Sequence, residues 1–299
     1  MAGRGVTVAQ VGWLALGLAA AVPAAADKDK DKGPNVLAYL HSSTNENGEA
    51  PSTWGYNAVD GKPTTAWCTG GDDPKGQMLI LGFSKQETIT HISVIPGAVG
   101  GDGLDKSHAR VSELEINNGQ EKRTIVLQDD VKPMELELQP PMHAWKVALV
   151  IKDIRPAEGG KHSACLAEVI LRSGGVTLTG DNVARQVRGM PRNKLALTGP
   201  WVDEPSAPER YLTLAMDGTF SWVFEPLMEG TPTKLQGEWD LANGRLLLKP
   251  KGAPKAIPLR MEREKVAGRK GTVDQLTLEG EGGHEKLPGN YQPNLMKAY

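Results

Sequence analysis

The sequence predicts an all-β protein of two domains, an N-terminal β-sandwich followed by a small antiparallel β-barrel. Short apolar or alternating runs recur along the chain between turn residues, a pattern typical of sandwiches and barrels. The 35 Gly and 21 Pro favour a turn-rich β protein over a helix bundle. A chain of 299 residues is long enough for one or two domains.

The first 26 residues have the pattern of a cleaved signal peptide. Arg4 supplies the n-region charge, residues 11–22 are apolar, and Ala24–Ala26 fits a small-residue cleavage site. The alternative is a membrane anchor, but an apolar run of about 12 residues is shorter than the roughly 20 needed to span a bilayer. We therefore expect cleavage after Ala26, a secreted or periplasmic protein, and no membrane span in the mature chain.

The first domain is expected at residues 35–172, after a charged linker at residues 27–34. Its short runs have the length and alternation of β-strands. The apolar run at residues 145–151 predicts a central buried strand. The expected strands are residues 35–40, 78–81, 89–95, 111–116, 124–127, 134–138, 145–151 and 164–171.

The second domain is expected at residues 195–287. A Gly-, Arg- and Pro-containing stretch at residues 173–194 predicts an interdomain linker. About seven strands follow, joined in two places by the hairpin-turn residues Asp217–Gly218 and Asn243–Gly244, which is enough for a small antiparallel barrel. Residues 288–299 are expected to be a loose tail.

The net charge bears on the partner of the protein, and the two cysteines bear on a disulfide. A formal net charge of -2 makes nucleic acid an unexpected partner. Cys68 and Cys165 are the two cysteines of the chain, and an oxidising compartment favours a disulfide between them. The alternative is a pair of buried free thiols.

The turn Asn-Ala-Val-Asp-Gly-Lys-Pro-Thr-Thr-Ala-Trp at residues 57–67 resembles the discoidin superfamily, or coagulation-factor C-type domains. There, such a turn opens a galactose-binding-like jelly roll. With residues 76–83, 107–116 and 165–169, the chain resembles the NADase-type glycan-binding family, which includes the translocation domain beside a bacterial NAD glycohydrolase. The resemblance covers roughly residues 35–172 and implies a jelly-roll sandwich that binds sugars.

A second, less specific resemblance covers residues 195–280, which look like small lipocalin-like domains of exported bacterial proteins. It is carried by Gly-x-Trp at residues 199–201 and 237–239 and by Asp-Gly-Thr-Phe at residues 217–220. These motifs describe hairpins and core, and such barrels can hold apolar ligands.

The discoidin-like resemblance implies one cofactor, a structural Ca²⁺. Asp60, Thr65 and Glu168 stand at positions that hold the ion, together with loop carbonyls, in relatives. Ca²⁺ takes 6–8 oxygen ligands in flexible geometry, which suits such a turn. We expect the ion to stiffen the rim of the domain. The alternative is that Asp60 forms an Asx-turn and Glu168 faces solvent or an arginine.

Sugar binding typically combines an aromatic platform with fixed hydrogen-bonding groups around it. Trp54 and Tyr56, just before the turn, are the candidate platform, whereas Trp67 is assigned to the core. A Gly-rich loop supplies the candidate polar contacts, Asp102, Lys106, His108 and Arg110. The alternatives are rim packing for the two aromatic side chains and a solvated loop for the polar set.

No catalytic residue is assigned. The chain has no Gly-x-Ser-x-Gly elbow, phosphate-binding loop or cysteine-nucleophile signature, and its six histidines lack metal-site spacing. The sequence predicts a non-catalytic exported protein that binds a glycan or cell-surface polymer. One alternative is a structural module of the cell envelope that docks another exported protein, and the other is an enzyme.

Overall fold

A computed structural model describes residues 37–42, 55–69, 73–100, 103–159, 163–203, 209–226, 231–268, 271–280 and 287–293. The expected signal peptide and charged linker, as well as Trp54 and Asp102, lie outside these described residues. Across the described ranges, no helix combines the length and apolar character needed to cross a membrane.

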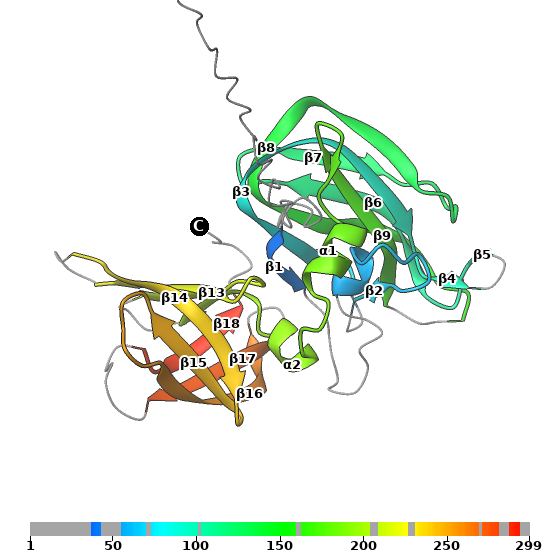
Figure 1. Cartoon of the computed structure of the whole chain (residues 1–299). Coiled ribbons are helices and arrows are strands. Elements are labelled where there is room, and N and C mark those ends of the chain that lie inside the picture. Colours follow the sequence, from blue (N-terminus) through cyan, green and yellow to red (C-terminus); the bar gives the residue numbers. More distant parts are fainter. Residues whose placement is uncertain are drawn as a thin grey trace, which may run out of the picture. The chain divides into compact units, whose positions relative to one another are not determined.

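A mainly antiparallel β-sandwich, in which β6 and β9 form a parallel pair, makes up the N-terminal domain (Figure 1). The path of hydrogen-bonded strands is β1-β3-β8-β6-β9-β10, with β2 added to β9 and β7 added to β6. A small hairpin, β4 with β5, projects from this domain, and the turn η2 (Gly55–Ala58) precedes β2. The strands are β1 (Leu37–Ser42), β2 (Trp67–Cys68), β3 (Met78–Pro96), β4 (Val99–Gly100), β5 (Gly103–Leu104), β6 (Ala109–Asn117), β7 (Lys122–Val126), β8 (Met134–Arg155), β9 (Ala164–Ser173) and β10 (Val176–Thr177).

The two longest strands, β3 and β8, each join two runs that the sequence separates. The first part of β3 pairs with β1 and the second part of β8, and the rest of β3 pairs with β9 and the first part of β8. Register shifts between Gly82 and Glu87 and between Ile89 and His91 mark the change of partner. The apolar residues of both strands, together with those of β6 and β9, fill one hydrophobic core.

Trp145 does not share the burial expected of its run. Val147, Leu149 and Ile151 are fully buried, and β8 lies between β3 and β6, so the central strand is confirmed. The Trp145 side chain, however, is 59% exposed. It lies opposite the β3 register shift between Gly82 and Glu87, where the inward-outward alternation of the strand is interrupted.

The segment expected as a linker, residues 173–194, contains β10 and two short helices, α1 (Asp181–Gln186) and α2 (Arg192–Leu195). Val183 of α1 is buried in the sandwich core. In α2, Lys194 Nζ lies 2.8 Å from an Asp240 carboxylate oxygen and 4.8 Å from the centre of the Trp239 ring. The segment is therefore folded, with α1 packed on the sandwich and α2 on the barrel.

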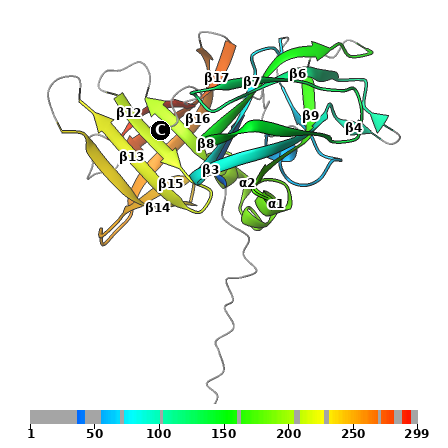
Figure 2. The same ribbon diagram turned by 90° about the horizontal axis from the view of Figure 1, so that it is seen from above.

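Eight consecutive antiparallel strands close the C-terminal barrel, because β18 pairs with both β17 and β11. Figure 2 shows β13, β14 and β15 of this barrel side by side. Residues 289–293 fall in the expected tail, yet they form β18 and complete the barrel. Its strands are β11 (Gly199–Asp203), β12 (Glu209–Leu214), β13 (Thr219–Glu225), β14 (Thr233–Ala242), β15 (Arg245–Pro250), β16 (Ile257–Gly268), β17 (Gly271–Gly280) and β18 (Gly289–Pro293).

Large aromatic side chains fill the described interior of the barrel. Trp201, Trp222 and Trp239 are almost fully buried and pack with leucines from most of the strands. The Trp222 indole donates to the Tyr291 hydroxyl, which in turn donates to the Leu287 carbonyl. An eight-stranded barrel has an interior about wide enough for side chains to fill, and this one is built as a packed core.

Candidate functional site

The disulfide between Cys68 and Cys165 is confirmed, and it joins β2 to β9 at the turn motif. His108 lies beside it: one ring nitrogen and the two sulfur atoms are within 4.8 Å of one another. His108 Nδ1 is 2.8 Å from the Ser163 hydroxyl oxygen. The two sulfur atoms are bonded to each other, so neither is available as a thiolate ligand in this state.

The turn after η2 is held by Asp60 and Thr65. Asp60 Oδ1 accepts a hydrogen bond from the Lys62 amide at 2.9 Å, which is an Asx-turn. The Thr65 hydroxyl lies 3.0 Å from each Asp60 carboxylate oxygen and 2.8 Å from the Lys62 carbonyl oxygen. The Asx-turn weighed against the ion site is therefore present, and it does not exclude an ion because carboxylate oxygens accept more than one contact.

Glu168 does not face solvent, and no arginine among the described residues pairs with it. Its side chain, on β9, is 3% exposed, and both carboxylate oxygens are buried without a hydrogen-bond partner in the described structure. Burial, followed by the negative charge of Asp60, raises the pKa of Glu168 to about 8. The nearby Gly61 and Val169 amides limit this rise without reaching the oxygens in hydrogen-bond geometry.

Tyr56 lies with this carboxylate pair. Burial raises the pKa of its hydroxyl, and the charges of Asp60 and Glu168 raise it further. The ring packs partly against the sandwich core. Burial also raises the pKa of Asp60. Two poorly solvated carboxylates and a phenol thus converge, an arrangement that a bound cation would stabilise.

The chemistry of these groups fits Ca²⁺. Asp60 and Glu168 offer hard carboxylate oxygens, and Glu168 has unused acceptor capacity in a buried position. The Asn57 and Lys62 carbonyl oxygens lie in the same turn, 3.3 Å and 2.8 Å from the Thr65 hydroxyl oxygen.

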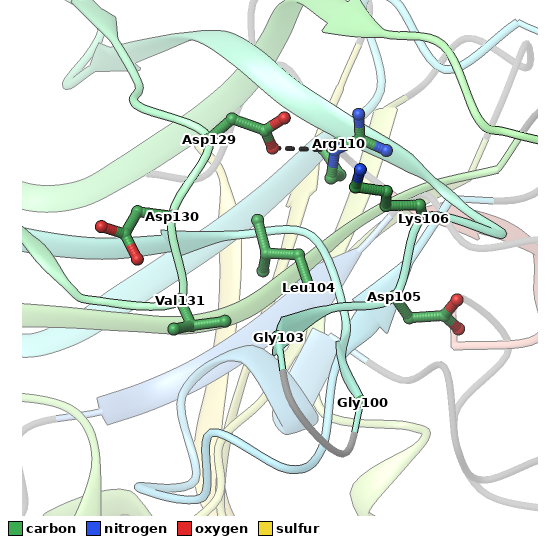
Figure 3. Close-up of a pocket in the computed structure, with 9 residues that line it drawn as sticks. All are labelled: Gly100, Gly103, Leu104, Asp105, Lys106, Arg110, Asp129, Asp130 and Val131. Carbon is green, nitrogen blue, oxygen red and sulfur yellow. Dashed lines mark hydrogen bonds and ion pairs between the residues drawn. The ribbon is translucent and has the colours of Figure 1, made fainter.

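A pocket of about 670 Å³ lies beside the β4–β5 hairpin and the loop after β7 (Figure 3). It brings together Lys106 and Arg110, two of the residues expected to contact a ligand. Asp129 and Arg110 point toward each other, whereas the Leu104 side chain lies between the two loops. The lining residues are Gly100, Gly103, Leu104, Asp105, Lys106, Arg110, Asp129, Asp130 and Val131.

Arg110 is the most buried charged group of this pocket, at 6% exposure. Its Nε donates to Asp129 Oδ1 at 2.8 Å, while Nη1 is buried without a partner among the described residues. Gly97, at φ +92°, makes room for it, because a Cβ there would lie 2.8 Å from Arg110 Cγ. Arg110 therefore holds unused hydrogen-bonding capacity at the pocket wall.

Backbone contacts fix the two loops of the pocket. Asp105 Oδ1 accepts from the Ser107 amide at 2.8 Å, and Asp130 Oδ1 accepts from the Lys132 amide at 3.1 Å. Lys106 forms an exposed ion pair with Glu158 at 3.1 Å. The result is a shaped rim with both donors and acceptors, the kind of lining that recognises hydroxyl groups.

The residues proposed for sugar contact separate into three places. Lys106 and Arg110 line the pocket, His108 lies by the disulfide, and Tyr56 lies by Asp60 and Glu168. Sequence reasoning did not anticipate Asp129, although its acidic turn between two strands was a usable signal. It also missed the exposed Trp145, because its apolar run gave no sign of a register shift.

The architecture and turn define a discoidin-like β-sandwich domain. The model of the family described as "NAD glycohydrolase translocation F5/8 type C domain" matches residues 31–172. The discoidin-like assignment of the N-terminal part is thereby confirmed. No curated protein matches the chain.

Several solved structures are similar to this chain. The arabinofuranosyltransferase AftD from Mycobacteria is 18% identical over 48% of this chain, which spans 11% of that protein, with a TM-score of 0.38. The family 32 carbohydrate-binding module of Clostridium perfringens NanJ, in complex with galactose, is 18% identical over 44% of this chain and 90% of its own, with a TM-score of 0.33. An F5/8 type C domain from Bacteroides fragilis is 16% identical, covers 46% and 95%, and has a TM-score of 0.33. Because these TM-scores are low, the functional argument rests on the geometry of the site in this chain.

Proposed function

We propose that this is an exported, non-catalytic protein whose discoidin-like domain binds a carbohydrate or surface polymer in the pocket lined by Lys106 and Arg110. The observation that carries the proposal is the Arg110 guanidinium, buried at the pocket wall with an unpartnered Nη1. A neighbouring hydroxyl or carboxylate of a sugar would supply the missing acceptor. Export is proposed from the signal-peptide pattern of residues 1–26.

A binding role suits the carboxylates of the pocket better than catalysis. Asp129 is engaged by Arg110, and Asp105 and Asp130 each cap a loop amide. A catalytic acid or base must instead be within reach of a reacting group and free to exchange its proton. The carboxylates here fix the shape of the rim.

Lys106→Ala tests the pocket in the mature chain, residues 27–299. We expect glycan-array binding by the wild type and an affinity about tenfold weaker for the variant by calorimetry, since a hydrogen bond to a charged group contributes about 1.5–3 kcal/mol. Lys75→Ala is the matched control, because Lys75 also forms an exposed ion pair, with Asp153 at 2.7 Å, and does not line the pocket. Unchanged affinity in Lys106→Ala, or no glycan bound at all, would overturn the proposal.

We also propose Ca²⁺ at Asp60 and Glu168 as a structural cofactor, on the strength of the buried, unpartnered Glu168 carboxylate. The ion would supply positive charge to the carboxylates and fix the turn. Thr65 orients Asp60 through its hydroxyl.

A second candidate function is docking to another exported protein, which the exposed Trp145 and Val126 favour. Their side chains are 59% and 67% exposed, and large apolar side chains at the surface are common in protein interfaces. Trp145→Ala separates the two functions: it should abolish capture of a protein partner and leave Lys106-dependent glycan binding intact. Loss of glycan binding in Trp145→Ala would count against docking and place the sugar on this ring.

A further inference from the structure

A second pocket, of about 460 Å³, lies among β9, β10, α1 and the Gly61 turn. It shares no lining residue with the pocket around Arg110. Arg172 forms part of its wall on β9, and Val176, Asp181 and Arg185 contribute from beyond the family match, which ends at residue 172. Most of this cavity is therefore built by the segment that connects the two domains of this chain.

The guanidinium groups of Arg172 and Arg185 line this pocket, and each uses only some of its five N–H donors in the hydrogen bonds described here. Arg172 Nη1 donates to Glu135 at 3.2 Å, but the Glu135 side chain is 60% exposed, so this ion pair is weak and replaceable. Arg185 makes two hydrogen bonds within its own helix, to the Asp181 carbonyl at 3.4 Å and to Asn182 Oδ1 at 3.5 Å. Both are at the long limit, and a guanidinium has five N–H donors.

The remaining walls suit a sugar that carries an acidic group. The side chains that line the pocket carry two guanidinium groups and one carboxylate, that of Asp181, while Glu135 pairs with Arg172 from outside the lining. One Asp181 carboxylate oxygen lies against Gly61, because a Cβ added to Gly61 would be 2.7 Å from that oxygen. Ile170 and the 47% exposed Val176 add an apolar wall. A planar oxyanion matches paired guanidinium groups, and the apolar face of a sugar ring matches the aliphatic side chains.

We propose that this pocket is a second ligand site, which binds an oxyanion-bearing sugar unit through Arg172 and Arg185. The recognised chemistry is a carboxylate, phosphate or sulfate on the ring. Glu135 holds Arg172 until the ligand displaces it. The site is independent of the pocket at Arg110, so either can fail without the other.

The test is an NMR titration of the ¹⁵N-labelled mature chain, residues 27–299, with glucuronic acid, glucose 6-phosphate, inorganic phosphate and glucose as probes. The two acidic sugars should shift the amides of Thr177 and Gly180, and glucose should not. Arg172→Gln and Arg185→Gln should each weaken binding about tenfold, the effect of losing one charge-assisted hydrogen bond. Glu135→Gln should strengthen it severalfold because it removes the competing carboxylate.

Arg188→Gln is the matched control, since Arg188 is also exposed near α1 but does not line the pocket. Unchanged affinity in both Arg172→Gln and Arg185→Gln, shifts confined to other amides, or equal binding of glucose would overturn the proposal. Inorganic phosphate binding as tightly as glucose 6-phosphate would overturn the role of the sugar ring. Lys106→Ala should leave all of these results unchanged, which separates this site from the proposed glycan pocket.

Discussion

Burial of Glu168 couples the stability of the sandwich to pH when no ion is bound. Its pKa is raised from 4.5 to about 8, so the folded state prefers the protonated carboxyl. Stability is then fully present below about pH 4.5 and is lost as pH rises toward 8. We expect the free energy of unfolding in EDTA to fall by up to about 1.4 kcal/mol per pH unit across this window. Glu168→Gln should flatten the slope, as measured by urea denaturation at pH 5, 6, 7 and 8.

Adding Ca²⁺ should change both the melting temperature and the pH dependence of stability. The ion binds the ionised carboxylates, so it should raise the melting temperature of the wild type and remove the loss of stability at pH 8. Asp60→Ala should abolish the rise. A wild-type melt that is the same in EDTA and in Ca²⁺ would contradict the ion site, whereas an unchanged pH slope in Glu168→Gln would contradict the assigned protonation.

The positions of single side chains were predictable from the sequence in some cases and not in others. The sequence predicts Trp67 in the core, and its side chain is fully buried. Of the four polar residues predicted to contact a ligand, Lys106 and Arg110 line one pocket. Tyr56 was expected beside them, but burial and the charges near its hydroxyl place it with Asp60 and Glu168. No local pattern could have shown this, because Glu168 reaches the turn through strand pairing.

Two neighbouring strands of the barrel, β14 and β15, pack so closely at Gly237 that this position has no room for a side chain. A Cβ at this position would collide with the Lys249 carbonyl oxygen across the β14–β15 ladder. Gly237→Ala should therefore lower the free energy of unfolding of the barrel by about 1–3 kcal/mol, the usual cost of overpacking. Differential scanning calorimetry would record this as a lower melting temperature.

Gly103→Ala is the control for Gly237→Ala, because its added Cβ would meet no atom within 4 Å and its φ is ordinary. It should leave the melting temperature unchanged. Equal stability of Gly237→Ala and the wild type would mean that the two strands separate at no cost, contrary to the packing seen here.

Element boundaries were predictable where turn chemistry is explicit. Asn243 and Gly244 both have positive φ and connect β14 to β15, as the hairpin residues indicated. The merging of separate runs into β3 and β8 was not predictable, since polar bulge residues interrupt the apolar pattern without ending the strand. The β18 strand was missed for a similar reason: five residues around Tyr291 are too few to show alternation.

For the whole molecule, the disulfide between Cys68 and Cys165 contributes stability because it lowers the conformational entropy of the unfolded chain. The loop spans 97 residues, for which the loop-closure model gives about 4–5 kcal/mol. Cys68→Ser/Cys165→Ser should lose stability of this order in chemical denaturation and unfold at a lower temperature. Titration of the denatured, unreduced wild type should find no free thiol.

Reduction of the wild type gives an independent comparison. A dithiol should bring its stability close to that of the double variant. Two reactive thiols in the unreduced protein, or a double variant as stable as the wild type, would contradict the structural role of the bridge.

The sequence by itself determined the all-β class, the two-domain order, the discoidin-like turn and the disulfide partners, because these depend on local periodicity, turn residues and the choice between two cysteines. The tertiary structure decided which polar groups converge. Pairing of β2 with β9 brings the turn of Asp60 to Glu168, and the packing of α1 creates the Arg172–Arg185 pocket. Burial and charge at such places come from segments far apart in the chain, and only the folded backbone brings them together.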